Sequence, residues 1–214
     1  MRRLVHLVFS PASRLTRLML GEKRLVVDPQ QPDDTKAHMP VFIDLDGTRC
    51  EGLWAIVDHL EGNYPETPLV PENAGERAEA LCWLDWAMST FGDHVTKKIV
   101  FEKANPRFTG GPTRSTPDMN VVRSGRETLH EMLPTIGKTV EERGNIAGRI
   151  CTIADLALAA HLSALDYFGE LPWDANAAVR EWYMRIKSRP SFRSLLADRV
   201  PGQPPVAHYA ELDF

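Results

Sequence analysis

The sequence predicts a small α/β domain followed by an all-helical domain. In residues 1–64, short runs rich in β-branched and aromatic residues alternate with helical patterns. Three prolines within residues 65–75 then mark a linker. In residues 76–214, apolar side chains recur at the three- and four-residue spacing of amphipathic helices. We therefore expect two domains with a boundary in the linker.

Composition and charge exclude several classes of protein. The 25 basic and 29 acidic residues give a formal net charge of −4 and are spread along the chain, so we expect no nucleic-acid-binding surface. Three widely spaced cysteines fit neither a disulfide framework nor a zinc site, which favours a reducing, cytoplasmic setting and no metal. The most apolar stretch, residues 153–165, contains Asp155 and His161 and is too short for a membrane span, so we expect no membrane insertion.

Local signals divide the first domain into strands and helices. Ser10 followed by Pro11 is typical of a helix start, because serine is a common cap and proline suits the first helical position. Asp46-Gly47 between two apolar runs predicts a β-hairpin. The expected elements are strands at 4–9, 25–27, 41–43 and 48–50, and helices starting at residue 11 and covering 53–63.

The second domain contains three clear helical stripes, at residues 81–91, 129–140 and 179–186. Residues 105–117 are rich in proline, glycine, serine and threonine and predict a long loop, a kind of segment that is often functional. Residues 199–214 predict an irregular tail, because prolines interrupt them.

Residues 148–155 provide the most specific signal for the fold. Thr152 and Asp155 have the spacing of a capping box at a helix start. This segment resembles the beginning of the core helix of glutathione S-transferases, and residues 188–192 resemble the end of the next helix in that family. The resemblance implies a thioredoxin-like N-terminal domain, a helical C-terminal domain and a homodimer that packs the first domain of one subunit against the second domain of the other.

The same resemblance implies the positions of a glutathione site. Met39-Pro40 is similar to the family's cis-proline, where the backbone of the preceding residue pairs with the cysteinyl part of glutathione. His38 lies where a lysine often contacts the glycine carboxylate. Ser10 lies where serine-type members carry the catalytic hydroxyl, and the dipole of the following helix also favours a thiolate. The structural alternative is that Ser10 only caps that helix.

Residues 52 and 53 depart from the family pattern. In an alignment of residues 46–61 without a gap, the glutamate–serine pair that binds the γ-glutamyl end of glutathione falls on Gly52 and Leu53. Neither side chain offers a hydrogen bond. Each lost bond to a charged group costs about 1.5–3 kcal/mol. Two losses weaken binding by about two to four powers of ten, so we expect a degenerate glutathione site.

The last residues of the chain are a second departure. Residues 208–214 resemble the tail of glutathione-transferase-like bacterial division proteins that localise with FtsZ, which implies a non-enzymatic homodimer that binds FtsZ filaments. On this hypothesis Tyr209, Asp213 and Phe214 are partner-binding residues. Trp54 joins them as an exposed anchor, because tryptophan is favoured in binding hot spots. The alternatives are that Trp54 belongs to the core and that the tail aromatics pack over the helical domain.

Two further hypotheses remain open on this sequence. One is a serine-type glutathione S-transferase that uses Ser10 and a site between the domains near Trp83, Trp86 and His94 to conjugate glutathione to small electrophiles. The other is a protein that holds a small molecule other than glutathione in the same cleft.

Overall fold

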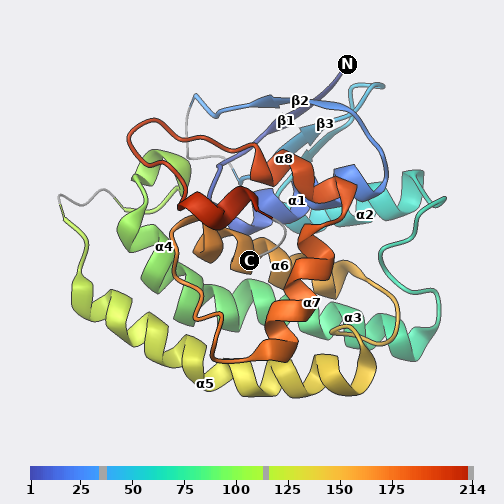
Figure 1. Cartoon of the computed structure of the whole chain (residues 1–214). Helices are drawn as coiled ribbons and strands as arrows, with labels where there is room; N and C mark the ends of the chain where they lie inside the picture. Colours follow the sequence, from blue (N-terminus) through green and yellow to red (C-terminus); the bar gives the residue numbers. More distant parts are fainter. Residues whose placement is uncertain (34–37, 113–115, 212–214) are drawn as a thin grey trace.

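The computed structural model describes residues 1–33, 38–112 and 116–211, which form a small sheet domain and a larger helical domain (Figure 1). The first domain comprises β1 (Arg2–Val5), α1 (Pro11–Glu22), β2 (Val27–Gln30), β3 (Val41–Ile43), β4 (Arg49–Glu51) and α2 (Leu53–Asn63). The second comprises α3 (Ala74–Trp86), η1 (Ala87–Thr96), α4 (Lys97–Lys103), η2 (Pro106–Phe108), α5 (Met119–Arg143), α6 (Ile153–Tyr167), α7 (Ala177–Lys187), η3 (Pro190–Phe192), α8 (Arg193–Leu196) and η4 (Ala207–Ala210). The chain has the expected thioredoxin-like and helical architecture.

The sheet has the strand order β2-β1-β3-β4. Strand β1 is parallel to β2 and antiparallel to β3, and β3 forms the predicted hairpin with β4. Gly47 in the hairpin turn has a φ of 90°, a conformation that glycine adopts without strain. The edge strand β2 contains Pro29, which is compatible with an edge because an edge strand needs fewer backbone donors.

The first strand ends earlier than the sequence predicts. It stops at Val5, and the expected extension to Phe9 is wrong. The backbone N–H of Phe9 instead donates to the carbonyl of Phe108, and its ring packs against Tyr167 and Phe168 of the helical domain. After a last bond from the His6 N–H to the Gln30 carbonyl of β2, residues 7–9 connect the domains instead of continuing the sheet.

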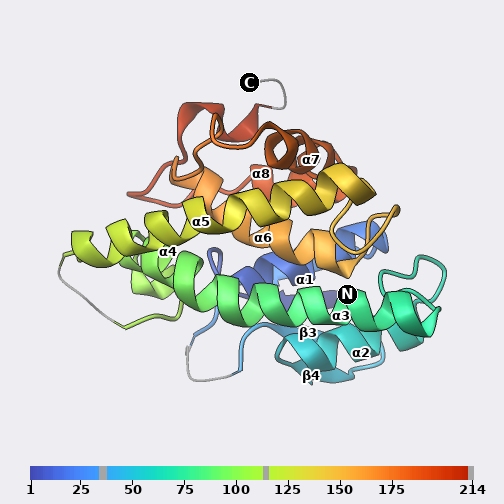
Figure 2. The same cartoon turned by 90° about the horizontal axis from the view of Figure 1, so that it is seen from below.

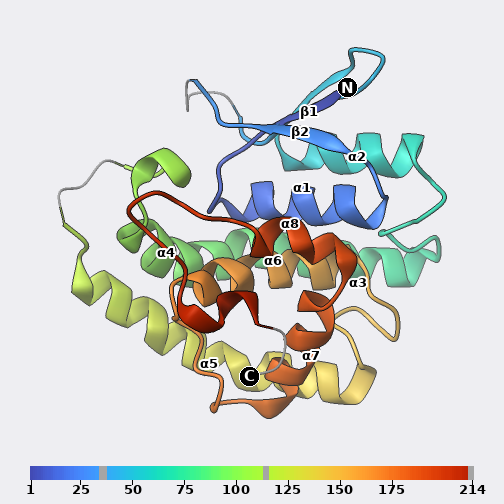
Figure 3. The ribbon, with the colours of Figure 1, turned by 45° about the horizontal axis from the view of Figure 1, so that its top comes forward.

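Helices α1 and α2 lie between the sheet and the helical domain (Figures 1 and 3). Helix α1 begins at Pro11, as predicted, and buries Leu15, Leu18 and Met19. It packs against α6, every residue of which is buried. Helix α6 is thus packed against apolar side chains from both domains, and the main hydrophobic core lies at the domain boundary.

The predicted capping box at the start of α6 is confirmed. The Thr152 N–H donates to Asp155 over 2.9 Å, and the Thr152 hydroxyl accepts from the Ala154 N–H. The Asp155 carboxylate also accepts from the indole of Trp182 over 3.0 Å and from the backbone N–H of Ile146. One carboxylate therefore fixes the helix start and two neighbouring segments.

Helices α3, η1 and α4 form one long helix beside α5 (Figure 2). Its middle part, η1, consists of π-helical turns over residues 87–96. Such turns are rare and are frequent at functional sites. They also change the faces on which the following side chains lie, because a π-helix departs from the 3.6-residue period. No helix among the described ranges combines the length and apolar character needed to cross a membrane.

Candidate functional site

A cavity of about 250 Å³ lies between the two domains, at the start of α1. The first domain contributes the beginnings of α1 and α2, and the second contributes η1, α4 and α6. Three residues expected to be functional from the sequence, Ser10, Leu53 and Trp54, meet in this one cavity. Its lining consists of Ser10, Pro11, Ala12, Leu53, Trp54, Met88, Gly92, Thr96, Lys97, Phe101 and His161.

Ser10 occupies the cap position of α1, but its side chain makes no capping hydrogen bond. The backbone is extended, with φ −72° and ψ 123°. The neighbouring Ser13 is the serine engaged in structure, because its hydroxyl accepts from the Leu7 N–H over 3.1 Å. The Ser10 hydroxyl therefore borders the cavity next to the positive end of the α1 dipole, where it can stabilise an anion.

The predicted glutathione-contacting segments lie next to each other. The Met39-Pro40 peptide bond is cis, and the Pro40 carbonyl accepts from the Gly52 N–H over 2.8 Å. A Cβ at position 52 would lie 3.9 Å from the Cβ of His38, which places His38 beside the start of α2. Gly52 has a φ of 78°, so this turn favours glycine over residues with side chains.

Leu53 and Trp54 begin α2 with apolar side chains. Leu53 is buried in the core, whereas Trp54 is 47% exposed and borders the cavity. Positions 52 and 53 therefore present no side-chain donor or acceptor to the cavity. The sequence left open whether Trp54 belongs to the core or is exposed. In the structure its side chain lines the cavity and is also partly exposed to solvent.

His161 is a titratable cavity residue that the sequence analysis did not assign to a site. It is 1% exposed, and its Nδ1 lies 2.7 Å from the hydroxyl of Thr96. Burial lowers the pKa of its imidazole to about 3, so the ring is neutral at physiological pH. The available signal was a single histidine inside the apolar run 153–165, which is equally typical of a core position.

The cavity at the start of α1 does not include Trp83, Trp86 and His94, which the enzyme hypothesis placed near its site. Trp83 and Trp86 line a separate apolar groove of about 590 Å³ between α3 and α5. His94 is exposed and does not line the cavity. For His94 the π-helical turns are a reason, because residues beyond Trp86 do not continue on the face that an α-helical period predicts.

Tyr209 does not lie on a partner surface. Its side chain has no exposed area, its hydroxyl lies 2.5 Å from the Arg14 guanidinium, and it donates to the carbonyl of Leu195 over 3.0 Å. The ring packs edge-on against Tyr167. Tyr209 therefore anchors the tail on the helical domain, as the structural alternative holds. The other two tail residues expected to bind a partner, Asp213 and Phe214, lie outside the described residues.

The part of the chain that the structure describes offers no cluster of metal ligands. Within residues 1–33, 38–112 and 116–211, no group of three or more histidine, cysteine, aspartate or glutamate side chains has a suitable arrangement. The thiol of Cys151 is largely buried, and burial raises its pKa to about 12, which makes it unreactive.

Comparison with known proteins finds relatives and solved structures that are similar over the whole chain. No protein-family model matches it. It is 40% identical to FtsZ-localized protein A of Caulobacter vibrioides, over 100% of this chain and 98% of that protein. A glutathione S-transferase from Rhodospirillum rubrum F11 superposes with a TM-score of 0.93 at 37% identity, and both chains are fully covered. The structure of FzlA from C. crescentus superposes with a TM-score of 0.91 at 39% identity, with coverages of 100% and 99%.

Proposed function

Because the chain belongs to the family of FtsZ-localized protein A, which has the glutathione S-transferase fold, we propose that it is a non-catalytic binding protein of the FtsZ division machinery. On this proposal it works in the cytoplasm as a homodimer. The large apolar groove between α3 and α5 supports the dimer, because an exposed apolar surface of this kind marks an interaction site.

The single observation that carries the proposal is the pair Gly52-Leu53. The fold retains the cis-proline turn and the start of α2, yet this position supplies no side chain that can hold an amino-acid head group. Backbone N–H groups at the helix start can hold a carboxylate only weakly by comparison. The absence of the family's glutamate and serine side chains at Gly52 and Leu53 supports the proposal that this protein binds a partner and does not conjugate glutathione.

A calorimetric titration tests the degenerate site. Wild-type protein should give no binding heat with glutathione up to several millimolar. Leu53→Ser adds a hydroxyl at the start of α2 and should raise the affinity by roughly tenfold or more, the value of one hydrogen bond to a charged group. Leu53→Ala is the matched control, because it removes the same packing and adds no donor. Micromolar binding by the wild type would contradict the proposal.

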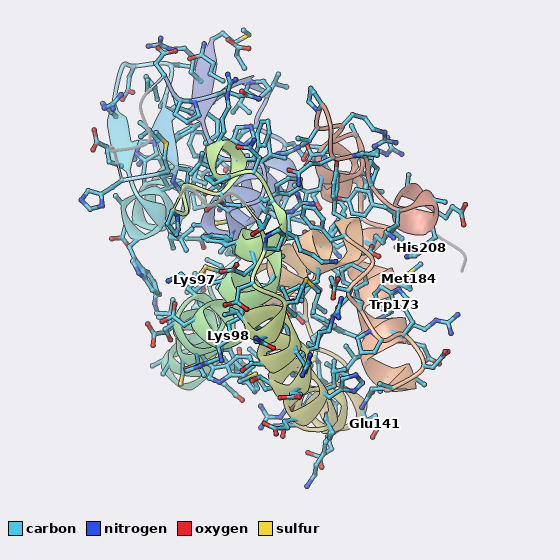
Figure 4. The ribbon with its side chains drawn as sticks, turned by 90° about the vertical axis from the view of Figure 1, so that its left-hand side faces the viewer. Lys97, Lys98, Glu141, Trp173, Met184 and His208 are labelled. Atoms are coloured by element: carbon cyan, nitrogen blue, oxygen red, sulfur yellow. The ribbon has the colours of Figure 1, made fainter. Side chains whose placement is uncertain are left out.

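Two surfaces are proposed for the partner. One is the cavity rim with Trp54, and the other is the end of the tail with Asp213 and Phe214. Lys97 of the cavity lining and His208 of the tail lie on opposite flanks of the helical domain (Figure 4). Tyr209 fixes the tail on the helical domain close to these two positions in the sequence. The two surfaces would therefore reach separate parts of a filament or neighbouring subunits.

Co-sedimentation with assembled FtsZ filaments tests the partner. The purified chain should pellet with filaments and stay in the supernatant without them. Asp213→Asn should reduce the pelleted fraction if the tail is a contact. Asp174→Asn, which changes a carboxylate elsewhere on the helical domain, is a control for general charge effects. Absence of pelleting by the wild type would remove FtsZ as the partner.

A specific observation also supports the enzyme hypothesis. The Ser10 hydroxyl makes no capping bond and borders the cavity, as a serine-type transferase requires. If the chain conjugates glutathione to a generic aromatic electrophile, Ser10→Ala should abolish that turnover while the free energy of unfolding stays unchanged. Turnover that is equal in Ser10→Ala and wild type would remove Ser10 as the catalytic residue.

A further inference from the structure

We propose that η1 is a conformational switch: the bond between Thr96 and His161 holds it in its π-helical form, and it changes to an α-helical register when that bond is lost. Helix α3 precedes η1 and α4 follows it, so the register of η1 sets how these two helices face one another. The inference concerns the backbone of one helix. It depends neither on FtsZ binding nor on a ligand of the cavity.

The backbone of η1 shows the wider helical repeat. The N–H of Lys97 donates to the carbonyl of Gly92, five residues earlier, whereas an α-helix joins residues four apart. A Cβ built on Gly92 would likewise lie 3.4 Å from the carbonyl oxygen of Ala87, five residues before it. Each such turn therefore holds one residue more than an α-helical turn. Because long π-helical runs are rare, we looked to side-chain contacts for what stabilises this one.

His161 of α6 contacts η1 with the spacing of this repeat. Its Nδ1 lies 2.7 Å from the hydroxyl of Thr96, and its ring packs edge-on against Phe91, with the centroids 5.4 Å apart. Phe91 and Thr96 are five positions apart in the sequence. In an α-helix they would point about 140° away from each other, whereas a five-residue repeat brings them to one face. The contacts of this one imidazole therefore favour the π-helical form.

The bond to Thr96 is the polar contact that fixes the register. His161 is 1% exposed and Thr96 has no exposed area, and Nε2 of the ring has no hydrogen-bond partner among the described residues. Burial lowers the pKa of the imidazole to about 3, so the ring stays neutral over the physiological pH range. One buried hydrogen bond shifts an equilibrium by roughly tenfold, which is enough to select between two closely matched registers.

Gly92 keeps the alternative register accessible. Glycine is among the weakest helix formers, so this position commits the backbone less strongly to one helical form than another residue would. The missing side chain also lets the helix approach the imidazole, because a Cβ here would lie 3.4 Å from Cε1 of His161. The same residue thus allows close contact with His161 and permits a change of register.

A change of register would move the segment that follows η1. Helix α3 carries Trp83 and Trp86 in the apolar groove, and α4 begins at Lys97 and leads into residues 104–112. When a π-helical turn becomes α-helical, one residue leaves that turn and α4 rotates relative to α3. A molecule that packs on the groove of α3 is therefore linked, through η1, to the position of α4 and of the loop after it.

The substitution Thr96→Val tests the inference, because it keeps the shape of the side chain and removes the hydroxyl. A crystal structure of the variant should show the Lys97 N–H donating to Asp93, four residues earlier, instead of to Gly92. In solution, the amide resonances of residues 87–103 should shift. Thr16→Val is the matched control, since Thr16 is also buried and its hydroxyl donates to the Ala12 carbonyl of α1 over 2.9 Å.

The control should keep the bond from Lys97 to Gly92 and the wild-type resonances of residues 87–103. Retention of that bond in Thr96→Val as well would overturn the inference, because the register would then not depend on the contact with His161.

Deletion of Ser89 is the reciprocal test, and it decides the question if Thr96→Val does not fold. Ser89 is an exposed residue of η1, and its removal takes one residue out of the π-helical segment. The variant should replace at least one π-helical turn by an α-helical turn. It should keep the contact with Thr96, seen as an unchanged Nδ1 resonance in ¹⁵N-histidine-labelled protein, and its urea unfolding midpoint should not fall. A lower midpoint or a shifted Nδ1 resonance would contradict the inference.

Discussion

Helix α1 meets the helical domain in two different ways along its length. In its middle, Arg14 and Arg17 form a closed polar seam with Asp198, and the Arg14 side chain has no exposed surface. At its N-terminal end, Ser10 borders a cavity that also contains the unpartnered Nε2 of His161. In the seam the chain supplies every partner for the buried charge. In the cavity it leaves polar groups available, so the seam fixes the domains and the cavity is open to a ligand.

Hydrogen bonds from arginine side chains hold α1 against the helical domain in its middle and near its C-terminal end. The Arg14 guanidinium donates to the hydroxyl of Ser163 over 2.7 Å and lies 2.5 Å from the hydroxyl of Tyr209. Near the C-terminal end of α1, Arg189 makes two bonds to the carboxylate of Glu22, at 2.6 and 2.7 Å. A paired charge in such a position does not by itself make a protein more stable than an apolar contact would, but removal of one partner is strongly destabilising.

The largest expected effect is therefore on the seam. Arg14→Met should lower the free energy of unfolding by about 3–5 kcal/mol, because it leaves buried hydroxyl and carboxylate groups without their donor. Arg17→Met is the matched control. It pairs with the same Asp198, but its side chain keeps 10% exposure whereas that of Arg14 has none, so its loss should be smaller, about 1–3 kcal/mol. Urea unfolding measures both values. Equal losses would show that burial does not distinguish the two arginines.

The pH dependence of stability sharpens the comparison. His6 is buried next to the seam, and its pKa is lowered to about 4 by burial and by the positive charge of Arg17. The unfolded chain binds a proton near the ordinary histidine pKa of 6.5, whereas the folded chain does not. The free energy of unfolding should therefore fall as the pH decreases from about 6.5 to 4, by about 3 kcal/mol from this group.

The variant His6→Gln isolates that contribution. Its urea unfolding should be compared with that of the wild type at pH 7.5, 5.5 and 4.5. The wild type should lose about 2.5 kcal/mol more than the variant over this range. His161 titrates in the same direction, but it is present in both proteins and cancels in the difference. A difference that is constant with pH would mean that the pKa of His6 is the same in the folded and the unfolded chain.

Local signals in the sequence predicted the fold correctly. The Asp46-Gly47 turn and the capping box of Thr152 and Asp155 each depend on residues within a few positions, so their geometry follows from composition and spacing. The same is true of the helix start at Pro11. Boundaries that depend on long-range contacts were missed: β1 ends at Val5, and the N–H of Phe9 bonds to Phe108 of the helical domain instead of to the sheet.

The cavity was harder to predict, because it depends on packing between segments that are distant in sequence. His161 lies in an apolar run and gains its significance only where η1 places Thr96 beside its Nδ1. Tyr209 was predicted to contact a partner, but it is a buried structural residue. An aromatic residue in a proline-rich tail is typical of a partner contact, but the buried Arg14 recruits its hydroxyl into the seam.

The smallest expected change in stability is at Trp54. Trp54→Ala should lower the free energy of unfolding by about 1 kcal/mol or less, because the ring is half-exposed. Tyr209→Phe should cost about 1–3 kcal/mol, since it leaves the Arg14 guanidinium and the Leu195 carbonyl each short of a partner. If the cavity rim binds the partner, Trp54→Ala should weaken co-sedimentation with FtsZ filaments by roughly tenfold. Tyr209→Phe should leave that binding unchanged, because the ring stays inside the seam. Weaker pelleting by Tyr209→Phe with normal pelleting by Trp54→Ala would reverse the roles assigned to the two regions.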